Sequence, residues 1–350
     1  MEKTSPVSPL SASFNGGPSG WSGLHGSSAA LALLNAARAY DGVVLVITRS
    51  SHQSHVLERD IDLFSDGALP LLHFPDHETL PYDPFSPHPD IVAERLATLS
   101  GLADMQRGLV LAPIATLMQR LPPRSHTLGQ NIQLKRGQEL VIDDFRQRLL
   151  KAGYSHADPV YQAGQFAVRG SVIDLFPTGH TKPLRIDLFD EEIDSLREFD
   201  PDSQRSTGEL EAFQMLPARE YPCDPASFDA MRKAFRYRFV VDTRNVTLYQ
   251  DLRQGQHPQG LEQYLPLFFE HTESLFDYLP SKLLVVTQAR AEEAAESFWS
   301  STNERWEQRR YDLKRPILEP EELFISAGDT LQRLDGFAAV RLFDTDEISK

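Results

Sequence analysis

The sequence predicts a protein of the α/β class, in which two chain segments build one largely parallel sheet around a small inserted α+β domain. Helical and strand patterns alternate over residues 25–127, as in parallel sheets joined by helices. A period-two pattern then dominates residues 164–200, and a short, mostly apolar run, predicted to be a buried strand, returns at residues 283–287. This order indicates that an α/β domain is interrupted and then resumed.

The composition places the chain among ordinary globular proteins with more than one core, since 41% of its 350 residues are hydrophobic and 24% are charged. A formal net charge of −15 argues against a broad electrostatic grip on nucleic acid, which requires clustered Lys and Arg. The single cysteine, Cys223, excludes an intrachain disulfide and favours a reducing cytoplasm. No apolar run reaches the roughly 18 residues of a membrane span, so we expect no membrane partner.

Residues 1–24 are rich in Ser, Pro and Gly and are predicted to form a flexible leader. A loop follows, then an Ala- and Leu-rich helix over residues 29–40 and a buried strand over residues 43–48. This order is typical of nucleotide-binding α/β domains, in which a phosphate loop stands before the helix. Here Ser27 follows Gly26 where the phosphate-binding Lys is required, and Trp21 takes the place of the leading Gly. We therefore expect no ATP binding.

The remainder of residues 25–127 continues the alternation of elements. A proline-punctuated, extended stretch covers residues 78–87. A helix is predicted from Pro89 until Gly108, a short buried strand over residues 109–112, and a helix over residues 114–121 that Pro122 stops.

Residues 128–216 are predicted to form the inserted domain, with a strand at residues 132–134, a helix at residues 142–153 and two or three strands within residues 164–200. The alternation assigns these side chains to the apolar face of the strands: Phe166, Val168, Val172, Leu184, Ile186 and Leu188.

The other face of these strands is predicted to carry Arg169, Arg185 and Phe189. An outward aromatic side chain beside arginines is typical of protein interfaces. A purely structural interpretation stays open at this point: the arginines could pair with the carboxylates that follow, such as Asp187 and Asp190, and Phe189 could pack under a neighbouring domain.

Residues 217–350 are predicted to complete the first domain. The pattern is mainly helical over residues 225–269, is followed by the strand at residues 283–287, and ends in a charged helix over residues 289–310. The late buried strand is expected to rejoin the first sheet.

Motifs of catalysis and metal binding do not stand out. The acidic residues from Asp190 to Glu192 follow a run that alternates with Arg185, whereas the magnesium-binding acidic box of ATPases follows a continuously apolar strand. His52 and His55 are interpreted as surface residues of a helix, because no H-E-x-x-H spacing is found. We expect no catalytic, cofactor-binding or metal-binding residue in this chain.

Four motifs give the chain a family resemblance. RGSVIDLFP at residues 169–177 and LRIDLFDEEI at residues 184–193 resemble the segment shared by the nucleotide-excision repair protein UvrB and the transcription-repair coupling factor family, Mfd. ETLPYDPFSPH at residues 78–88 and DSLREFDPDSQR at residues 194–205 are similar to the Mfd version. The resemblance covers about residue 25 to the end of the chain.

This resemblance implies a UvrB-like fold with a degenerate helicase-type sheet domain, and a non-catalytic adaptor for transcription-coupled nucleotide-excision repair. The inserted domain is then expected to bind UvrA through the positions of Arg169, Arg185 and Phe189, and so to recruit UvrA to stalled RNA polymerase. The segment at residues 75–90 is too short for the DNA-clamping hairpin of UvrB.

The resemblance implies that other parts of the family protein bind RNA polymerase and DNA, and that an ATP-dependent translocase uses ATP and Mg. This chain lacks those parts, so we expect it to be a fragment. The resemblance also implies an intramolecular contact with the C-terminal domain that restrains the full-length translocase. The alternative is an ATP-dependent, UvrB-like DNA damage-binding repair protein, and the residue that separates the two interpretations is Ser27.

Overall fold

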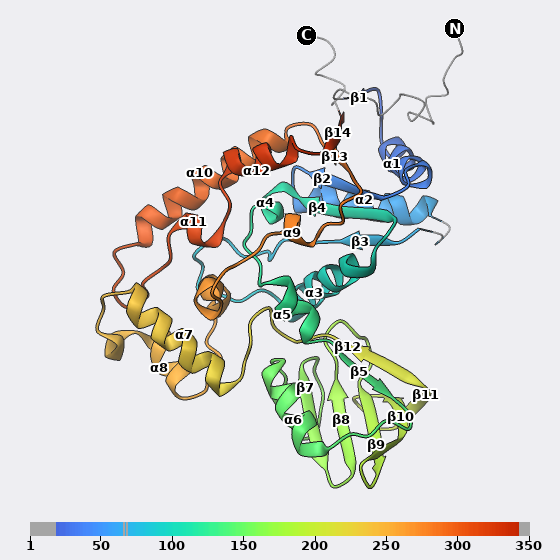
Figure 1. Cartoon of the computed structure of the whole chain (residues 1–350), viewed down its shortest axis with the longest axis vertical. Coiled ribbons are helices and arrows are strands. Elements are labelled where there is room, and N and C mark those ends of the chain that lie inside the picture. Colours follow the sequence, from blue (N-terminus) through green and yellow to red (C-terminus); the bar gives the residue numbers. More distant parts are fainter. Residues whose placement is uncertain (1–18, 66, 68, 343–350) are drawn as a thin grey trace.

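The computed structural model describes residues 19–65, 67 and 69–342, and Figure 1 shows them as a large α/β part with a smaller, strand-rich part at one end. Within the described part of the chain, no helix combines the length and the apolar character needed to cross a bilayer.

The main sheet has six strands, all paired in parallel, in the order β1-β14-β13-β2-β4-β3. The strands of the main sheet are β1 (Ser19–Trp21), β2 (Val43–Thr48), β3 (Leu71–His73), β4 (Gly108–Pro113), β13 (Leu283–Thr287) and β14 (Ala338–Leu342). Because β13 pairs with β2, the segments before and after the insertion share one sheet. The predicted fold class is confirmed.

Helices cover both faces of this sheet, which explains why β2 and β4 are buried along their whole length. One face packs on α1 (Ser28–Ala39) and α2 (Ser51–Phe64), which meet Val44 and Val46 of β2. Val43, Leu45 and Ile47 point to the other face. The helices of that face are α3 (Pro89–Asp104), α4 (Ile114–Leu117), α9 (Leu275–Tyr278), α10 (Ala291–Arg309) and α12 (Ala327–Leu334).

A third group of helices packs around a separate aromatic core that includes Tyr82, Phe235 and Tyr264. Its elements are α7 (Pro225–Arg238), α8 (Thr247–Arg253), α11 (Pro320–Leu323) and the 3-10 helices Thr243–Asn245 and Leu261–Phe268. Tyr82 brings the proline-punctuated segment into this core, so the extended segment links the sheet to the helical group.

The inserted domain follows the short helix α5 (Arg124–Gly129) and contains α6 (Ile142–Lys151). Its six-stranded sheet has the order β11-β10-β9-β8-β7-β6, and β12 and β5 pair separately. The strands of the inserted domain are β5 (Ile132–Lys135), β6 (Ser155–His156), β7 (Gln165–Arg169), β8 (Val172–Phe176), β9 (Leu184–Phe189), β10 (Glu192–Phe199), β11 (Ser206–Leu210) and β12 (Ala212–Met215). In Figure 1 this domain lies at the end of the molecule away from β1 and β14.

The predicted leader requires a correction. Residues 1–18 lie outside the described residues, but Ser19–Trp21 form the edge strand β1, parallel to β14. Trp21 is buried in the core beneath α1, because strand pairing with the distant C-terminal segment gives this residue an apolar environment. Strand β3 was also not predicted, since a three-residue element shows no usable period.

Candidate protein-interaction face

The sheet of the inserted domain has one fully covered face and one partly covered face, on which Val160, Ala167 and Phe199 form a small buried cluster. Leu184, Ile186 and Leu188 of β9 are buried in a core with α6, β5 and β12. Because side chains alternate along a strand, Arg185 and Phe189 stand on the opposite face. A shallow hollow of about 390 Å³ on that face is lined by Arg169, Val172, Asp174, Arg185, Asp187, Arg197 and Ser206.

Asp174 lies at the centre of this face and is only 1% exposed. It stands on β8 directly opposite Arg185 on β9, and its carboxylate accepts hydrogen bonds from both Arg185 and Arg169. A buried carboxylate is tolerated when it is paired and hydrogen-bonded in this way. Asp174 therefore fixes the positions of the two arginines that the sequence pointed to.

The guanidinium of Arg185 makes three hydrogen bonds and one aromatic contact. Its Nε and Nη2 donate to the two oxygens of Asp174 at 2.6 and 2.9 Å, and Nη1 donates to the carbonyl of Gln204 at 3.1 Å. Its guanidinium also stacks 4.7 Å from the ring centroid of Phe199. Hydrogen bonds with Asp174 raise the pKa of Arg185, against the effect of burial. The side chain is therefore a rigid, charged part of the face.

Arg169 is the more accessible arginine, with 45% of its side chain exposed. It pairs with Asp174 and lies 3.7 Å from a carboxylate oxygen of Asp158. A third arginine, Arg197 on β10, pairs with Asp187, which also accepts a 2.9 Å hydrogen bond from Ser195. With Asp158 beside Arg169, the three arginines Arg169, Arg185 and Arg197 are matched by three carboxylates, so this small area is close to neutral on a strongly acidic chain.

Phe189 is the last residue of β9 and its side chain is 75% exposed. The two-residue hairpin that follows has Asp190 in the left-handed region at φ 54°. The turn leads directly into β10, where Glu192 pairs with Phe189. A large apolar ring is thus held at a strand end, pointing into solvent, by backbone pairing and not by packing of the ring itself.

Two features of this face differ from the pattern-based expectation. Val172, predicted on the apolar face, lies opposite Arg169 and lines the hollow. A two-residue turn at Gly170 joins the strands, and residues directly opposite each other share a face, so the alternation restarts after the turn. The arginines do pair with carboxylates, but the main partner is Asp174, which stands between them in sequence. The sequence could have indicated this role of Asp174, because a carboxylate between Ile173 and Leu175 in a predicted strand requires a charged or hydrogen-bonding partner.

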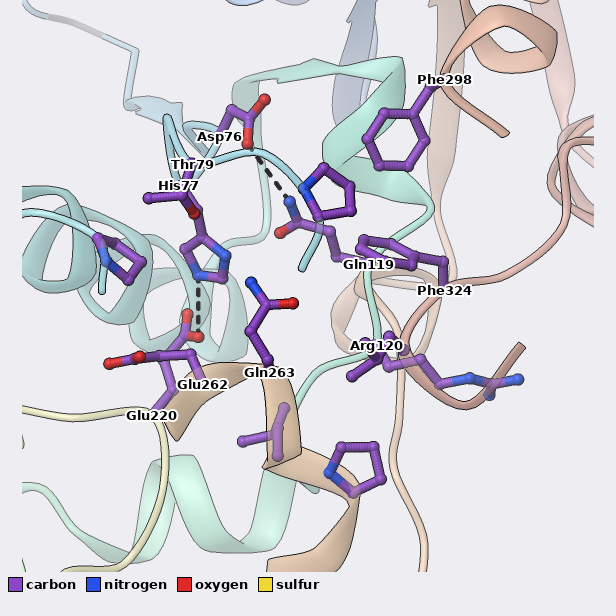
Figure 2. Close-up of a pocket in the computed structure, with 15 residues that line it drawn as sticks. Asp76, His77, Thr79, Gln119, Arg120, Glu220, Glu262, Gln263, Phe298 and Phe324 are labelled. Carbon is purple, nitrogen blue, oxygen red and sulfur yellow. Dashed lines mark hydrogen bonds and ion pairs between the residues drawn. The ribbon is translucent and has the colours of Figure 1, made fainter. Parts of the chain in front are cut away.

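A second cavity lies where the sheet domain, the linker after the inserted domain and the 3-10 helix Leu261–Phe268 meet. Figure 2 shows His77 pointing toward Glu220, and Asp76 joined to Gln119. Nε2 of His77 lies 3.1 Å from Oε2 of Glu220. The cavity holds about 50 Å³. Small-molecule sites usually measure about 300–1,000 Å³. We interpret it as a joint between chain segments and not as a ligand pocket.

Comparison with known proteins identifies the inserted domain. Residues 132–221 match the UvrB interaction domain family. The chain is 40% identical over 91% of its length to the transcription-repair-coupling factor of Escherichia coli, and 38% identical over 89% to that of Haemophilus influenzae. It is 28% identical over 75% of its length to the factor of Bacillus subtilis. The resemblance inferred from the motifs is thereby confirmed.

The same comparisons set the scale of the match. The chain covers 28%, 27% and 24% of the length of these three relatives, about a quarter of each. The matched family region, residues 132–221, contains every strand of the inserted domain and all the residues of the arginine-bearing face.

Proposed function

We propose that this chain is a non-catalytic adaptor module of transcription-coupled nucleotide-excision repair, and that its inserted domain binds UvrA. Phe189 is the central contact in this proposal, with Arg169 and Arg185 beside it. The match of residues 132–221 to the UvrB interaction domain supports the location of the site on this domain.

The exposure of Phe189 carries the proposal. Leaving Phe189 75% exposed forgoes roughly three quarters of the about 1.5–3 kcal/mol that complete burial of such a side chain contributes. Aromatic and arginine side chains dominate the binding energy of protein interfaces, where they insert into desolvated pockets. An exposed ring beside fixed arginines therefore fits a partner surface that combines an apolar pocket with carboxylates.

The pairing with Asp174 makes the arginines suitable for this role. Arg185 is already ordered, so a partner pays little conformational entropy to bind it. Arg169 keeps 45% of its side chain accessible while its head is held near Asp174. A partner carboxylate could approach Arg169 from solvent without dismantling the buried pair.

The wider role that we propose for this chain is that of a module within a longer protein similar to its relatives. In a transcription-repair coupling factor, the module would recruit UvrA to RNA polymerase stalled on DNA, in the cytoplasm, while ATP and Mg are used by an ATP-dependent translocase outside this chain. We also propose that the same face makes an intramolecular contact with a C-terminal domain in the full-length protein, which would restrain that protein until UvrA is needed.

The direct test is binding of purified UvrA to this chain, measured by isothermal titration calorimetry. Phe189→Ala should weaken binding, whereas Phe85→Ala provides a matched control, because Phe85 is 65% exposed and lies outside the inserted domain. Equal affinity of both variants, or no UvrA binding by the parent chain, would overturn the proposal.

The same protein sample separates this proposal from an ATP-dependent, UvrB-like repair protein. The loop before α1 offers Ser27 where a phosphate-binding Lys would be needed. We expect neither ATP hydrolysis nor tight duplex DNA binding by the chain. Saturable ATP binding at micromolar concentration would favour the UvrB-like alternative.

A further inference from the structure

A cluster of histidine and glutamate side chains lies at the edge of the main sheet, on elements outside the inserted domain. His55 and Glu58 come from α2, His73 is the last residue of β3, and Glu94 comes from α3. Figure 1 shows α2 and β3 in the sheet-bearing part of the molecule and α3 between that sheet and the inserted domain. Neither the motifs nor the family match includes any of them.

Local structure explains how the cluster forms. His55 and Glu58 are three residues apart on a helix, so their side chains share one face. His73 is brought to them by the parallel pairing of β3 with β4. The hydroxyl of Thr98 on α3 also donates a hydrogen bond to the carbonyl of His73, which fixes the strand end against that helix.

The separations between the potential ligand atoms are those of a metal site. Nδ1 of His73 lies 3.2 Å from Oε2 of Glu58, and Nδ1 of His55 lies 3.5 Å from the same oxygen. One ligand atom from each of the three residues falls within a group whose members are all within 4.8 Å of one another. Ligands about 2.0–2.1 Å from a tetrahedral zinc ion are themselves about 3.3–3.4 Å apart.

The environment of His73 is a second observation. Its side chain is 2% exposed, and Nε2 has no hydrogen-bond partner among the described residues. Nδ1 lies 3.2 Å from Oε2 of Glu58 and 2.9 Å from Oε1 of Glu94, so it is ion-paired with two carboxylates. Because a histidine binds a metal ion in its neutral form, a cation held between these atoms would replace the proton on Nδ1 and keep a positive charge beside the carboxylates.

We propose that His55, Glu58 and His73 bind one divalent transition-metal ion of the zinc class, with Glu94 bordering the site. Two imidazole nitrogens and a carboxylate oxygen suit zinc better than magnesium or calcium, which prefer all-oxygen sites. Half of the His55 side chain is exposed, at 49%, so the ion has a path from solvent. The bound metal would tie α2 to β3 at the sheet edge.

The test uses the whole chain, first treated with a chelator and then dialysed against zinc. We expect one equivalent of zinc per chain and a rise in the thermal midpoint, since a ligand that binds only the folded state stabilises it. Cobalt used as a substitute should give the visible absorption of a tetrahedral ion. His55→Ala and Glu58→Gln should each weaken zinc binding by roughly tenfold to a hundredfold or more.

His52→Ala is the matched control, because His52 is an exposed histidine one turn earlier on α2 and lies outside the group. It should leave zinc binding unchanged. Because His55 is at the surface, His55→Ala should keep the fold without metal. Unfolding of the metal-free variant in urea checks this. If zinc uptake is unaffected by His55→Ala and Glu58→Gln, or if His52→Ala reduces it equally, the proposal fails and the cluster is an ion pair of His73 with its carboxylates.

Discussion

Nε of Arg95 donates a 2.7 Å hydrogen bond to Glu220, and the side chains of both residues are almost completely buried. Arg95 belongs to α3 of the sheet domain, whereas Glu220 lies in the linker that leaves the inserted domain. Arg95 also donates to the carbonyl of Pro75 and stacks over the ring of Phe74. This buried pair joins chain segments 125 residues apart.

Glu220→Gln is expected to reduce the free energy of unfolding by about 3–5 kcal/mol, because it leaves the charge of Arg95 buried without a counter-charge. Urea unfolding at neutral pH measures this loss. Glu321→Gln, which removes an exposed glutamate, is the control and should change stability little. A loss below about 1 kcal/mol at Glu220 would mean that water reaches the pair.

The same pair predicts a pH dependence. Burial alone would raise the pKa of Glu220, but the charges of Arg95 and His77 and their hydrogen bonds hold its pKa well below the ordinary range. A folded-state pKa below the unfolded value of about 4.3 means that the unfolded state binds more protons under acid conditions. The contribution of Glu220 is therefore complete above this value and is lost as pH falls.

Unfolding of the parent chain and of Glu220→Gln, compared between pH 6 and pH 3, tests this dependence. The stability difference between them should be constant at the upper end and shrink by about 1.4 kcal/mol per pH unit below about pH 4.3. A difference that stays constant down to pH 3 would show that Glu220 titrates normally.

Phe189→Ala should affect UvrA binding and Ile186→Ala should affect stability, because the two side chains stand on opposite faces of β9. Phe189→Ala should barely change stability but weaken UvrA binding by about 2 kcal/mol, or about thirtyfold in Kd. Ile186 is fully buried, so Ile186→Ala should cost about 2–5 kcal/mol of stability. Unfolding of the domain by Phe189→Ala, with UvrA affinity intact, would show that the faces are assigned the wrong way round.

Asp174→Asn should weaken UvrA binding although Asp174 is buried and touches no partner. The change removes the charge that orders Arg169 and Arg185, and hydrogen bonds to charged groups contribute about 1.5–3 kcal/mol to stability. Calorimetric titration with UvrA, together with urea unfolding, measures both effects. Asp194→Asn, an exposed position on β10, is the control. Unchanged affinity in Asp174→Asn would show that the arginines need no such positioning.

The inserted domain should be removable without unfolding the remainder. Ile132, at its start, pairs with Met215, at its end, and paired residues of antiparallel strands are only about 4.5–5.5 Å apart at Cα. A chain with residues 132–215 replaced by a short Gly-Ser linker should unfold cooperatively in urea. A broad transition with bound hydrophobic dye would instead show that the sheet domain needs the insertion, and the predicted domain boundaries would be wrong.

The sequence by itself determined those features that depend on local period. The runs at Val43–Thr48 and Leu283–Thr287, apolar except for the final threonine of each, identified central strands, because a parallel strand covered on both faces is nearly continuously apolar. The alternation of Leu184, Ile186 and Leu188 with Arg185 and Phe189 likewise identified the partly covered face, because the strand itself sets that period.

Tertiary structure alone decided which distant groups meet. The pairing of Asp174 with Arg185 depends on the register between two strands, and the turn at Gly170 moved Val172 to the polar face. The approach of His73 to Glu58 and the burial of Arg95 beside Glu220 require elements that are far apart in the chain. Local patterns carry no information on such contacts, because their geometry is set only when the sheet order and the helix packing are complete.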